Sequence, residues 1–160
     1  MSALSAVSLE RIAREVAKYP ADQKQSAVMA ALAIAQDQHG WLPGDVMEAV
    51  AAVLGMAPVA VYEVATFYNM YHLESGGRHK VRICTNLPCA LSGGVAAADH
   101  LKRTLGVGFG ETTADGCVTL SEGECLGACG DAPVLLVDNK RMCGRMSGDK
   151  LDALVEELRK

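Results

Sequence analysis

The amino-acid sequence predicts an α+β chain, with a helical bundle over residues 1–75 followed by a small α/β domain with a mixed sheet over residues 76–160. Two observations lead to this prediction. Apolar residues recur at helical spacing through the first half, whereas short alternating segments typical of strands occur in the second half. The change falls at Ser75-Gly76-Gly77, a tripeptide typical of a turn or hinge. We therefore expect a domain boundary there.

Helical periodicity fills the first half. The first helix is expected over residues 9–16, with Ser8 as its N-cap. Further helices are expected over 28–39, over 46–53 and from Pro58 toward Tyr68. Gly55 follows the third of them, as glycine commonly follows a helix C-terminus. Because the links between these segments are short, they predict a small bundle.

The second half reads as strands and helices in the order β-α-β-β-β-α. The expected elements are strands over 79–84, 118–120, 134–137 and 141–143, and helices over 95–105 and from Ser147 to Leu158. Such an order describes helices that cover a mixed sheet.

Composition and charge exclude several classes of protein. The net charge is −4, and charges of both signs are scattered without a basic stripe, which argues against nucleic-acid binding and against a polybasic membrane-surface protein. No apolar run approaches the roughly 18 residues of a membrane-spanning helix. The first residues lack the pattern of a secretory signal, so we expect a reducing, cytoplasmic location.

Four of the six cysteines form two closely spaced pairs. Cys84 and Cys89 are separated by four residues, and Cys125 and Cys129 by three. Each pair follows an expected strand, so the two loops would converge at one sheet edge if those strands are neighbours. Four converging thiolates suit a [2Fe-2S] cluster, in which each iron takes two of them.

Spacing alone leaves the bound group open. Structural zinc accepts the same four thiolates, and short cysteine pairs occur in zinc sites as well. Two disulfides would use the same residues but are disfavoured in a reducing compartment. Cys117 and Cys143 are expected to be buried small hydrophobes. Cys117 lies only eight positions before Cys125 and could replace one of the four.

The surroundings of the cysteines resemble the E-type subunit family of NADH:quinone oxidoreductase, the bacterial respiratory complex I. The resemblance is carried by residues 40–43, 64–70, 84–89 and 122–134, and because these stretches are spread along the sequence it extends over nearly the whole chain. The resemblance implies a thioredoxin-like ferredoxin domain in the second half. It also implies one [2Fe-2S] cluster bound by Cys84, Cys89, Cys125 and Cys129.

The same resemblance implies partners. The helical half should dock on a neighbouring subunit that holds FMN and binds NADH, and the cluster should exchange single electrons with that flavin. This chain would then be an electron-carrier subunit, without an NADH or FMN site of its own, on the peripheral arm of an inner-membrane complex. The alternatives are the small subunit of an NAD-dependent formate dehydrogenase or hydrogenase and, in another class, a structural zinc module that organises partners.

Two weaker signals accompany the cysteines. Glu122, Glu124 and Asp131 flank the second pair, and they would lower the reduction potential if they are close and ionised, or act only as screened loop carboxylates otherwise. The stretch from Tyr62 to Tyr71 is rich in aromatic residues and methionine, which are enriched at the centres of protein interfaces.

Overall fold

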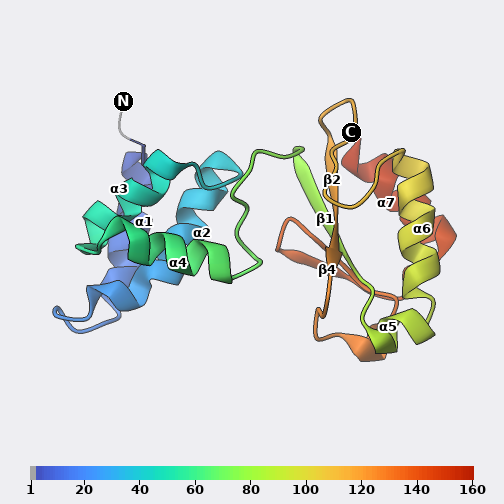
Figure 1. The fold of residues 1–160 in the computed structure, drawn as a ribbon, viewed down its shortest axis with the longest axis horizontal. Coiled ribbons are helices and arrows are strands. Elements are labelled where there is room, and N and C mark those ends of the chain that lie inside the picture. Colours follow the sequence, from blue (N-terminus) through green and yellow to red (C-terminus); the bar gives the residue numbers. More distant parts are fainter. Residues whose placement is uncertain (1–2) are drawn as a thin grey trace. The chain divides into compact units, whose positions relative to one another are not determined.

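The chain divides after Ser75 into two compact units (Figure 1). The computed structural model describes residues 3–160. The first unit is helical and the second contains all the named strands of the described residues. The class of fold expected from the sequence, a helical bundle followed by an α/β domain with a mixed sheet, is confirmed.

Helices of the first unit follow the periodicity of the sequence. They are α1 (Ala6–Val16), η1 (Lys24–Ala27), α2 (Val28–His39), α3 (Gly44–Leu54) and α4 (Pro58–Phe67). Gly40 and Gly55 adopt left-handed conformations, with φ of 78° and 67°, and end α2 and α3 in the way that glycine permits. The core is aliphatic and includes Ile12, Leu32, Leu42, Val46, Val50 and Val61.

The start of α1 differs from the prediction. Ser5, not Ser8, is the N-cap, and its Oγ accepts a hydrogen bond of 3.1 Å from the backbone amide of Ser8. Ser8 lies inside the helix, is buried, and donates from its Oγ to Gln38 Oε1 at 2.7 Å. The prediction failed because both serines are good caps, and a partner on α2 decided which of them is buried.

The residues after α4 are held against α2. Gln36 Oε1 accepts a hydrogen bond of 2.7 Å from the amide of His72, and Gln36 Nε2 donates one of 3.0 Å to the carbonyl of Met70. The hydroxyl of Tyr71, which is buried, donates to the carbonyl of Met29 at 2.8 Å. These bonds tie the chain to the first unit up to position 72.

The second unit is built on a four-stranded sheet, counted over residues 3–160, with strand order β2-β1-β3-β4. Its elements are β1 (His79–Cys84), α5 (Leu87–Leu91), α6 (Gly94–Leu105), β2 (Val118–Gly123), η2 (Cys129–Asp131), β3 (Leu135–Val137), β4 (Arg141–Cys143) and α7 (Gly148–Leu158). β1 pairs in parallel with β2, and β3 pairs antiparallel with both β1 and β4. The right of Figure 1 shows α6 and α7 along one side of this sheet.

Buried and partly exposed residues alternate along β1 and β2, and the buried ones form part of the second core. Val81 and Ile83 of β1 and Val118 and Leu120 of β2 are buried, whereas the residues between them are partly exposed. The buried face packs against apolar residues of the two long helices, namely Ala97, Ala98, Leu101, Leu105, Leu151, Leu154, Val155 and Leu158. This core fixes the ends of β1 and β2, which carry the candidate site.

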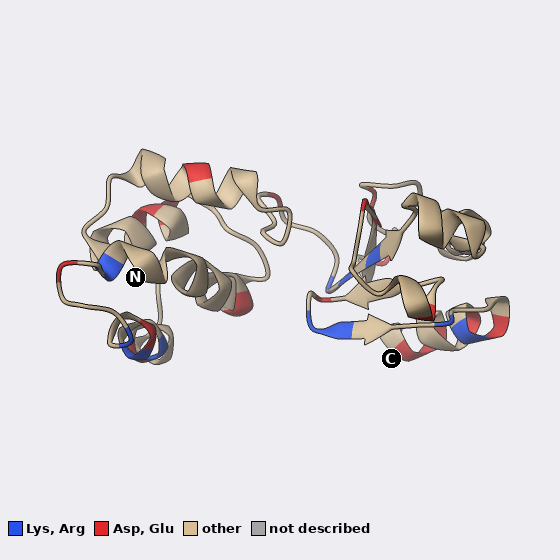
Figure 2. Ribbon diagram, turned by 90° about the horizontal axis from the view of Figure 1, so that it is seen from below, with Lys and Arg blue, Asp and Glu red and all other residues tan. Residues whose placement is uncertain are grey.

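Charged residues of both signs occur on both units (Figure 2). Among residues 3–160, no single helix has the length and apolar character needed to cross a membrane. By length and composition alone α3 and α4 reach that threshold as a pair, with a bend of 119° between them.

Candidate metal centre

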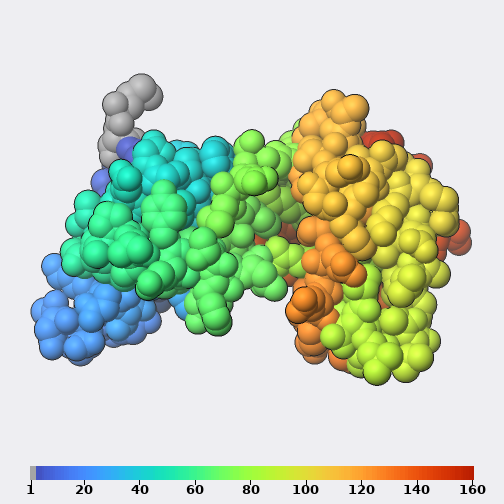
Figure 3. All heavy atoms as spheres, in the orientation of Figure 1, coloured from blue at the N-terminus to red at the C-terminus, as the bar shows by residue number. Residues whose placement is uncertain are grey.

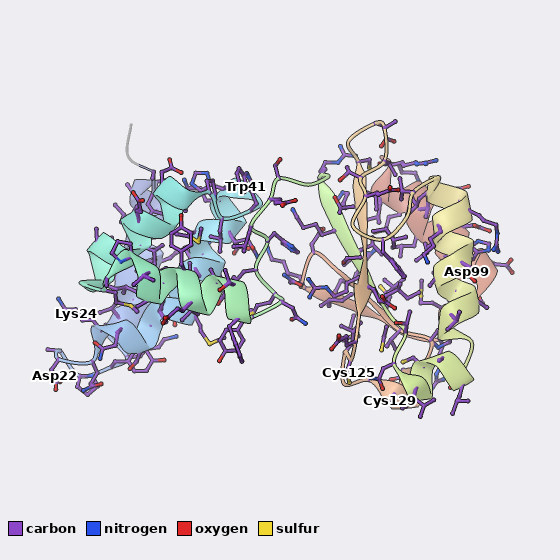
Figure 4. The ribbon with its side chains drawn as sticks, viewed as in Figure 1. Asp22, Lys24, Trp41, Asp99, Cys125 and Cys129 are labelled. Atoms are coloured by element: carbon purple, nitrogen blue, oxygen red, sulfur yellow. The ribbon has the colours of Figure 1, made fainter. Side chains whose placement is uncertain are left out.

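Both cysteine loops leave the sheet at one edge. Because β1 and β2 are parallel neighbours, with Cys84 opposite Gly123, their carboxyl ends lie together. Cys84 is the last residue of β1, and Cys125 follows the end of β2 by two positions. The condition for the two loops to meet, that the two strands are neighbours, is therefore met, and Figure 4 shows Cys125 and Cys129 at this end of the unit, near α5.

The first pair of cysteines is buried. Cys84 and Cys89 are each 1% exposed, and they pack with Val134 against the partly buried Leu126. Cys89 lies within α5, a helix of five residues that begins after Asn86. The amide of Cys84 donates to the carbonyl of Val134 at 3.0 Å. Two thiols are thus placed beneath the surface by β1, α5 and Val134, the residue before β3.

The pKa of the Cys89 thiol depends on its burial and on neighbouring groups. Burial raises the pKa of the Cys89 thiol to about 11, and a hydrogen bond and charge from Cys84 and the charge of Cys129 act in the same direction. The backbone amide of Val134 donates toward the same sulfur and opposes them. The charges of Cys84 and Cys129 thus both act on the Cys89 thiol. A positive ion would reverse this balance, because it stabilises thiolates.

Gly94 allows the first loop to lie directly on α6. A Cβ at this position would lie 2.8 Å from the carbonyl oxygens of both Cys84 and Cys89. Any residue other than glycine would press on the backbone of the loop. The close approach of Gly94 to the backbone of Cys84 and Cys89 was not predicted from the sequence. It depends on how α6 packs against the loop.

The second pair of cysteines lies on the surface. Cys125 and Cys129 are both exposed, and Cys129 begins the short helix η2. Between them, Gly127 has a left-handed φ of 72°. The Sγ of Cys84 lies 4.0 Å from the carbonyl oxygen of Glu124, which brings the two loops into contact. Figure 3 shows the orange segment of the second pair beside the yellow-green segment of the first.

The donor set fits a binuclear cluster. The four thiols are the right type and number of donors but are not gathered tightly, because among residues 3–160 no three side chains of His, Cys, Asp or Glu lie close enough together to hold a single metal ion. A [2Fe-2S] cluster needs two thiolates at each of its two irons. The two loops supply two thiols each, with two sulfurs buried and two at the surface. Soft thiolate ligands are those that iron–sulfur clusters use.

The two other cysteines lie outside this set. Cys117 precedes β2, at the opposite end of a six-residue strand from Cys125, which is roughly 20 Å away at the usual rise per residue. Its Sγ donates to the carbonyl of Leu158 at 3.0 Å, and it is buried as expected. Cys143 is only partly buried and packs against the second core. Cys117 therefore lies at the other end of β2 from the two cysteine loops.

Three carboxylates, those of Glu122, Glu124 and Asp131, surround the second loop, and all three are exposed. Glu122 Oε1 accepts a hydrogen bond of 2.5 Å from Thr85 Oγ1, which links the two loops. Asp131 Oδ1 lies 3.1 Å from Arg145 Nη2. Arg145 comes from the segment between β4 and α7, and its part in the site was not predicted.

The arrangement of two cysteine loops on a mixed sheet can be compared with known proteins. The model of the thioredoxin-like [2Fe-2S] ferredoxin family matches residues 12–159. The chain belongs to this family. Membership of the thioredoxin-like ferredoxins supports an iron–sulfur cluster and a role in electron transfer.

Named relatives of this chain agree with the resemblance seen around the cysteines. The chain is 49% identical over 150 residues to the NADH-quinone oxidoreductase E 2 subunit of Rhizobium meliloti, covering 94% of this chain and 88% of the relative. It is 36% identical over 143 residues to NADH-quinone oxidoreductase subunit 2 of Thermus thermophilus, covering 89% and 79%. The predicted relationship to the E-type subunits is confirmed.

A solved structure shares the fold. It is an NAD⁺-reducing [NiFe]-hydrogenase in the H₂-reduced state, with a TM-score of 0.70 and 22% identity. The match covers 82% of this chain and 22% of the hydrogenase chain. At this identity the likeness extends to the fold alone.

Proposed function

We propose that this chain is the electron-carrying E-type subunit of an NADH:quinone oxidoreductase, and that Cys84, Cys89, Cys125 and Cys129 bind one [2Fe-2S] cluster. The observation that carries the proposal is the placement of the two cysteine loops at one sheet edge, in a chain 49% identical to a named subunit of this type. The cluster exchanges single electrons with the FMN of an NADH-binding partner subunit. The complex lies at the inner membrane, with this chain on its cytoplasmic arm and without an NADH or FMN site of its own.

The residues of the site suit a charged cluster that gains and loses single electrons without making or breaking bonds. Burial of Cys84 and Cys89 excludes water from the inner side, and the amide of Val134 is directed at a sulfur. Amide hydrogen bonds to sulfur and the degree of solvent exposure both help to set the potential of an iron–sulfur cluster. The exposed Cys125 and Cys129 leave the outer side open toward a partner.

Exposed leucines beside the buried pair provide a contact surface for that partner. Leu87 is 68% and Leu91 82% exposed, and both belong to α5, the helix that carries Cys89. Large exposed apolar side chains close to a site favour a protein contact there. We propose that the flavin subunit covers α5.

The helical unit offers a second apolar surface. Phe67 at the end of α4 is 80% exposed, and its ring packs edge-to-face on Tyr68 at 5.0 Å. Met70 and Leu73 beyond it are also exposed. Because aromatic residues and methionine are enriched at interface centres, we propose that residues 1–75 form the docking domain, with Phe67 in the contact.

Reduction of the cluster by NADH through the purified flavin subunit tests the proposal. We expect rapid bleaching of the visible absorption when the wild-type chain is mixed with that subunit and NADH. The Leu91→Asp and Phe67→Asp variants should bind the subunit more weakly and bleach more slowly. Val7→Asp is the matched control, because Val7 is 67% exposed on α1, a helix that carries neither surface. Failure of the wild-type chain to accept electrons from the flavin subunit would contradict the proposal.

The alternatives predict other results. A subunit of an NAD-dependent formate dehydrogenase or hydrogenase would be encoded beside the other subunits of that enzyme and would bind its flavin subunit instead. A structural zinc module would purify with stoichiometric zinc and no visible absorption. The named relatives at 36–49% identity support the quinone oxidoreductase.

A further inference from the structure

A three-residue segment between β4 and α7, which we call the clasp (residues 144–146), holds the second cysteine loop. The amide of Arg145 donates to the carbonyl of Asp131 at 2.6 Å, and the amide of Met146 donates to the carbonyl of Pro133 at 3.1 Å. Met146 is buried in the second core. The clasp therefore connects the loop to the rigid part of the unit, although it contains no candidate ligand.

The fit between the clasp and the loop is close. A Cβ at Gly144 would lie 2.8 Å from the Cβ of Asp131 and 3.1 Å from its carbonyl oxygen, so the clasp approaches to a distance that only glycine permits. Arg145 has a left-handed φ of 53°, which is uncommon for a residue other than glycine. In this conformation its amide bonds to the Asp131 carbonyl, and its guanidinium lies 3.1 Å from the Asp131 carboxylate.

Asp131 connects the clasp to Cys129 through backbone hydrogen bonds. The amide of Asp131 donates to the carbonyl of Ala128 at 3.0 Å, and the amide of Ala132 donates to the carbonyl of Cys129 at 3.3 Å. These bonds close η2, the turn that begins at Cys129. A residue that fixes Asp131 from both its backbone and its side chain thereby fixes the position of Cys129.

We propose that Arg145 is a positioning residue of the cluster and raises its reduction potential, an inference that rests on the proposed function. It orients Cys129 through Asp131, and its charge offsets a carboxylate two residues from a ligand. Reduction adds a negative charge to the site, and net charge is one of the quantities that set the potential. Loss of the guanidinium leaves Asp131 uncompensated and disfavours the reduced form.

Redox titration of the full-length protein tests the charge effect. Because the ion pair is exposed, at 73% and 61%, the effect is modest, and we expect Arg145→Gln to shift the equilibrium about threefold toward the oxidised form. For one electron this is about 28 mV downward, at 59 mV per tenfold change. Arg145→Lys should keep most of the wild-type potential, and 1 M salt should reduce the shift.

Arg141→Gln is the matched control. Arg141 is also an exposed arginine in an ion pair, 2.6 Å from Glu157 on α7, and its replacement removes the same charge without touching the cysteine loop. The control should titrate close to wild type. Equal shifts in the two variants, or a wild-type potential in Arg145→Gln, overturn the inference.

Hydrogen exchange of the metal-free protein tests the positioning effect independently of the cluster. We expect the amides of Asp131 and Ala132 to exchange about threefold faster in Arg145→Gln, as befits the loss of an exposed ion pair, and to stay unchanged in Arg141→Gln. Unchanged exchange in Arg145→Gln overturns the positioning role. A wild-type protein that binds no cluster contradicts the proposed function instead, and the exchange result still decides whether the clasp holds the loop.

Discussion

Replacement of Gly94 by alanine probes how closely the first cysteine loop must lie on α6. The added Cβ would meet the carbonyl oxygens of Cys84 and Cys89 at 2.8 Å and the carbonyl carbon of Cys89 at 2.9 Å. These are backbone atoms, which cannot rotate out of the way as the end of a side chain could. Either the loop moves away or the first turn of α6 unwinds, and each outcome displaces the buried thiols.

The size of the effect follows from two opposing terms. Overpacking of a close contact costs about 1–3 kcal/mol. Replacing a helical glycine by alanine recovers at most about 1 kcal/mol. We therefore expect Gly94→Ala to destabilise the second unit by about 1–2 kcal/mol. Gly148→Ala is the matched control, because Gly148 is likewise the first residue of its helix, and its Cβ would meet nothing closer than His100 Cε1 at 3.6 Å.

The two variants are compared by hydrogen exchange of the β1 amides in the full chain and by iron content after identical reconstitution. Gly94→Ala should exchange faster and hold less iron than wild type, whereas Gly148→Ala should match or exceed the wild-type protection. If the two variants show the same protection and the same iron content, the close contact between α6 and the loop is not required, and the reasoning is refuted.

Three further predictions concern single side chains. Burial raises the pKa of Tyr71 to about 12 from 10.0. The protonated hydroxyl therefore stabilises the fold fully below pH 10, and about 2–3 kcal/mol of folding free energy is lost as the pH rises from 10 to 12. Tyr71→Phe should cost about 1 kcal/mol at pH 7 and abolish that loss, measured by urea unfolding with Trp41 fluorescence. Gln36→Ala should speed amide exchange at His72 about fivefold by mass spectrometry, since one hydrogen bond is worth about 1 kcal/mol; unchanged exchange contradicts this. Glu124→Gln should raise the reduction potential, and a titration without an upward shift counts against a role for this carboxylate.

Long helices and strands could be predicted from the spacing of apolar residues in the sequence, and short helices could not. The expected helix over 95–105 and the strand over 79–84 agree with α6 and β1 to within one residue. Helix α5 was missed, because five residues carry no measurable period and Pro88 lies inside it. Ser147 occupies the predicted N-cap position of α7 but makes no side-chain capping bond.

The sequence indicated the thiols of the candidate site but not their supports. Spacing predicted two cysteine loops that each follow a strand, and the parallel pairing of β1 with β2, which brings the loops to one edge, came from the structure. The roles of Gly94, the Val134 amide and Arg145 depend on contacts between segments far apart in the chain, which no local pattern records. Spacing also left iron and zinc open, and the sequence around the cysteines was needed to favour iron.

Iron analysis with optical and EPR spectroscopy of the anaerobically purified chain tests the central claim most directly. We predict a brown protein with about two irons per chain, bleached by dithionite with the EPR signal of a reduced [2Fe-2S] cluster. Cys117→Ser should keep this signal, and Cys125→Ser should lose or alter it. A colourless wild-type protein with stoichiometric zinc, or a Cys125→Ser variant with an unchanged cluster, would contradict the account.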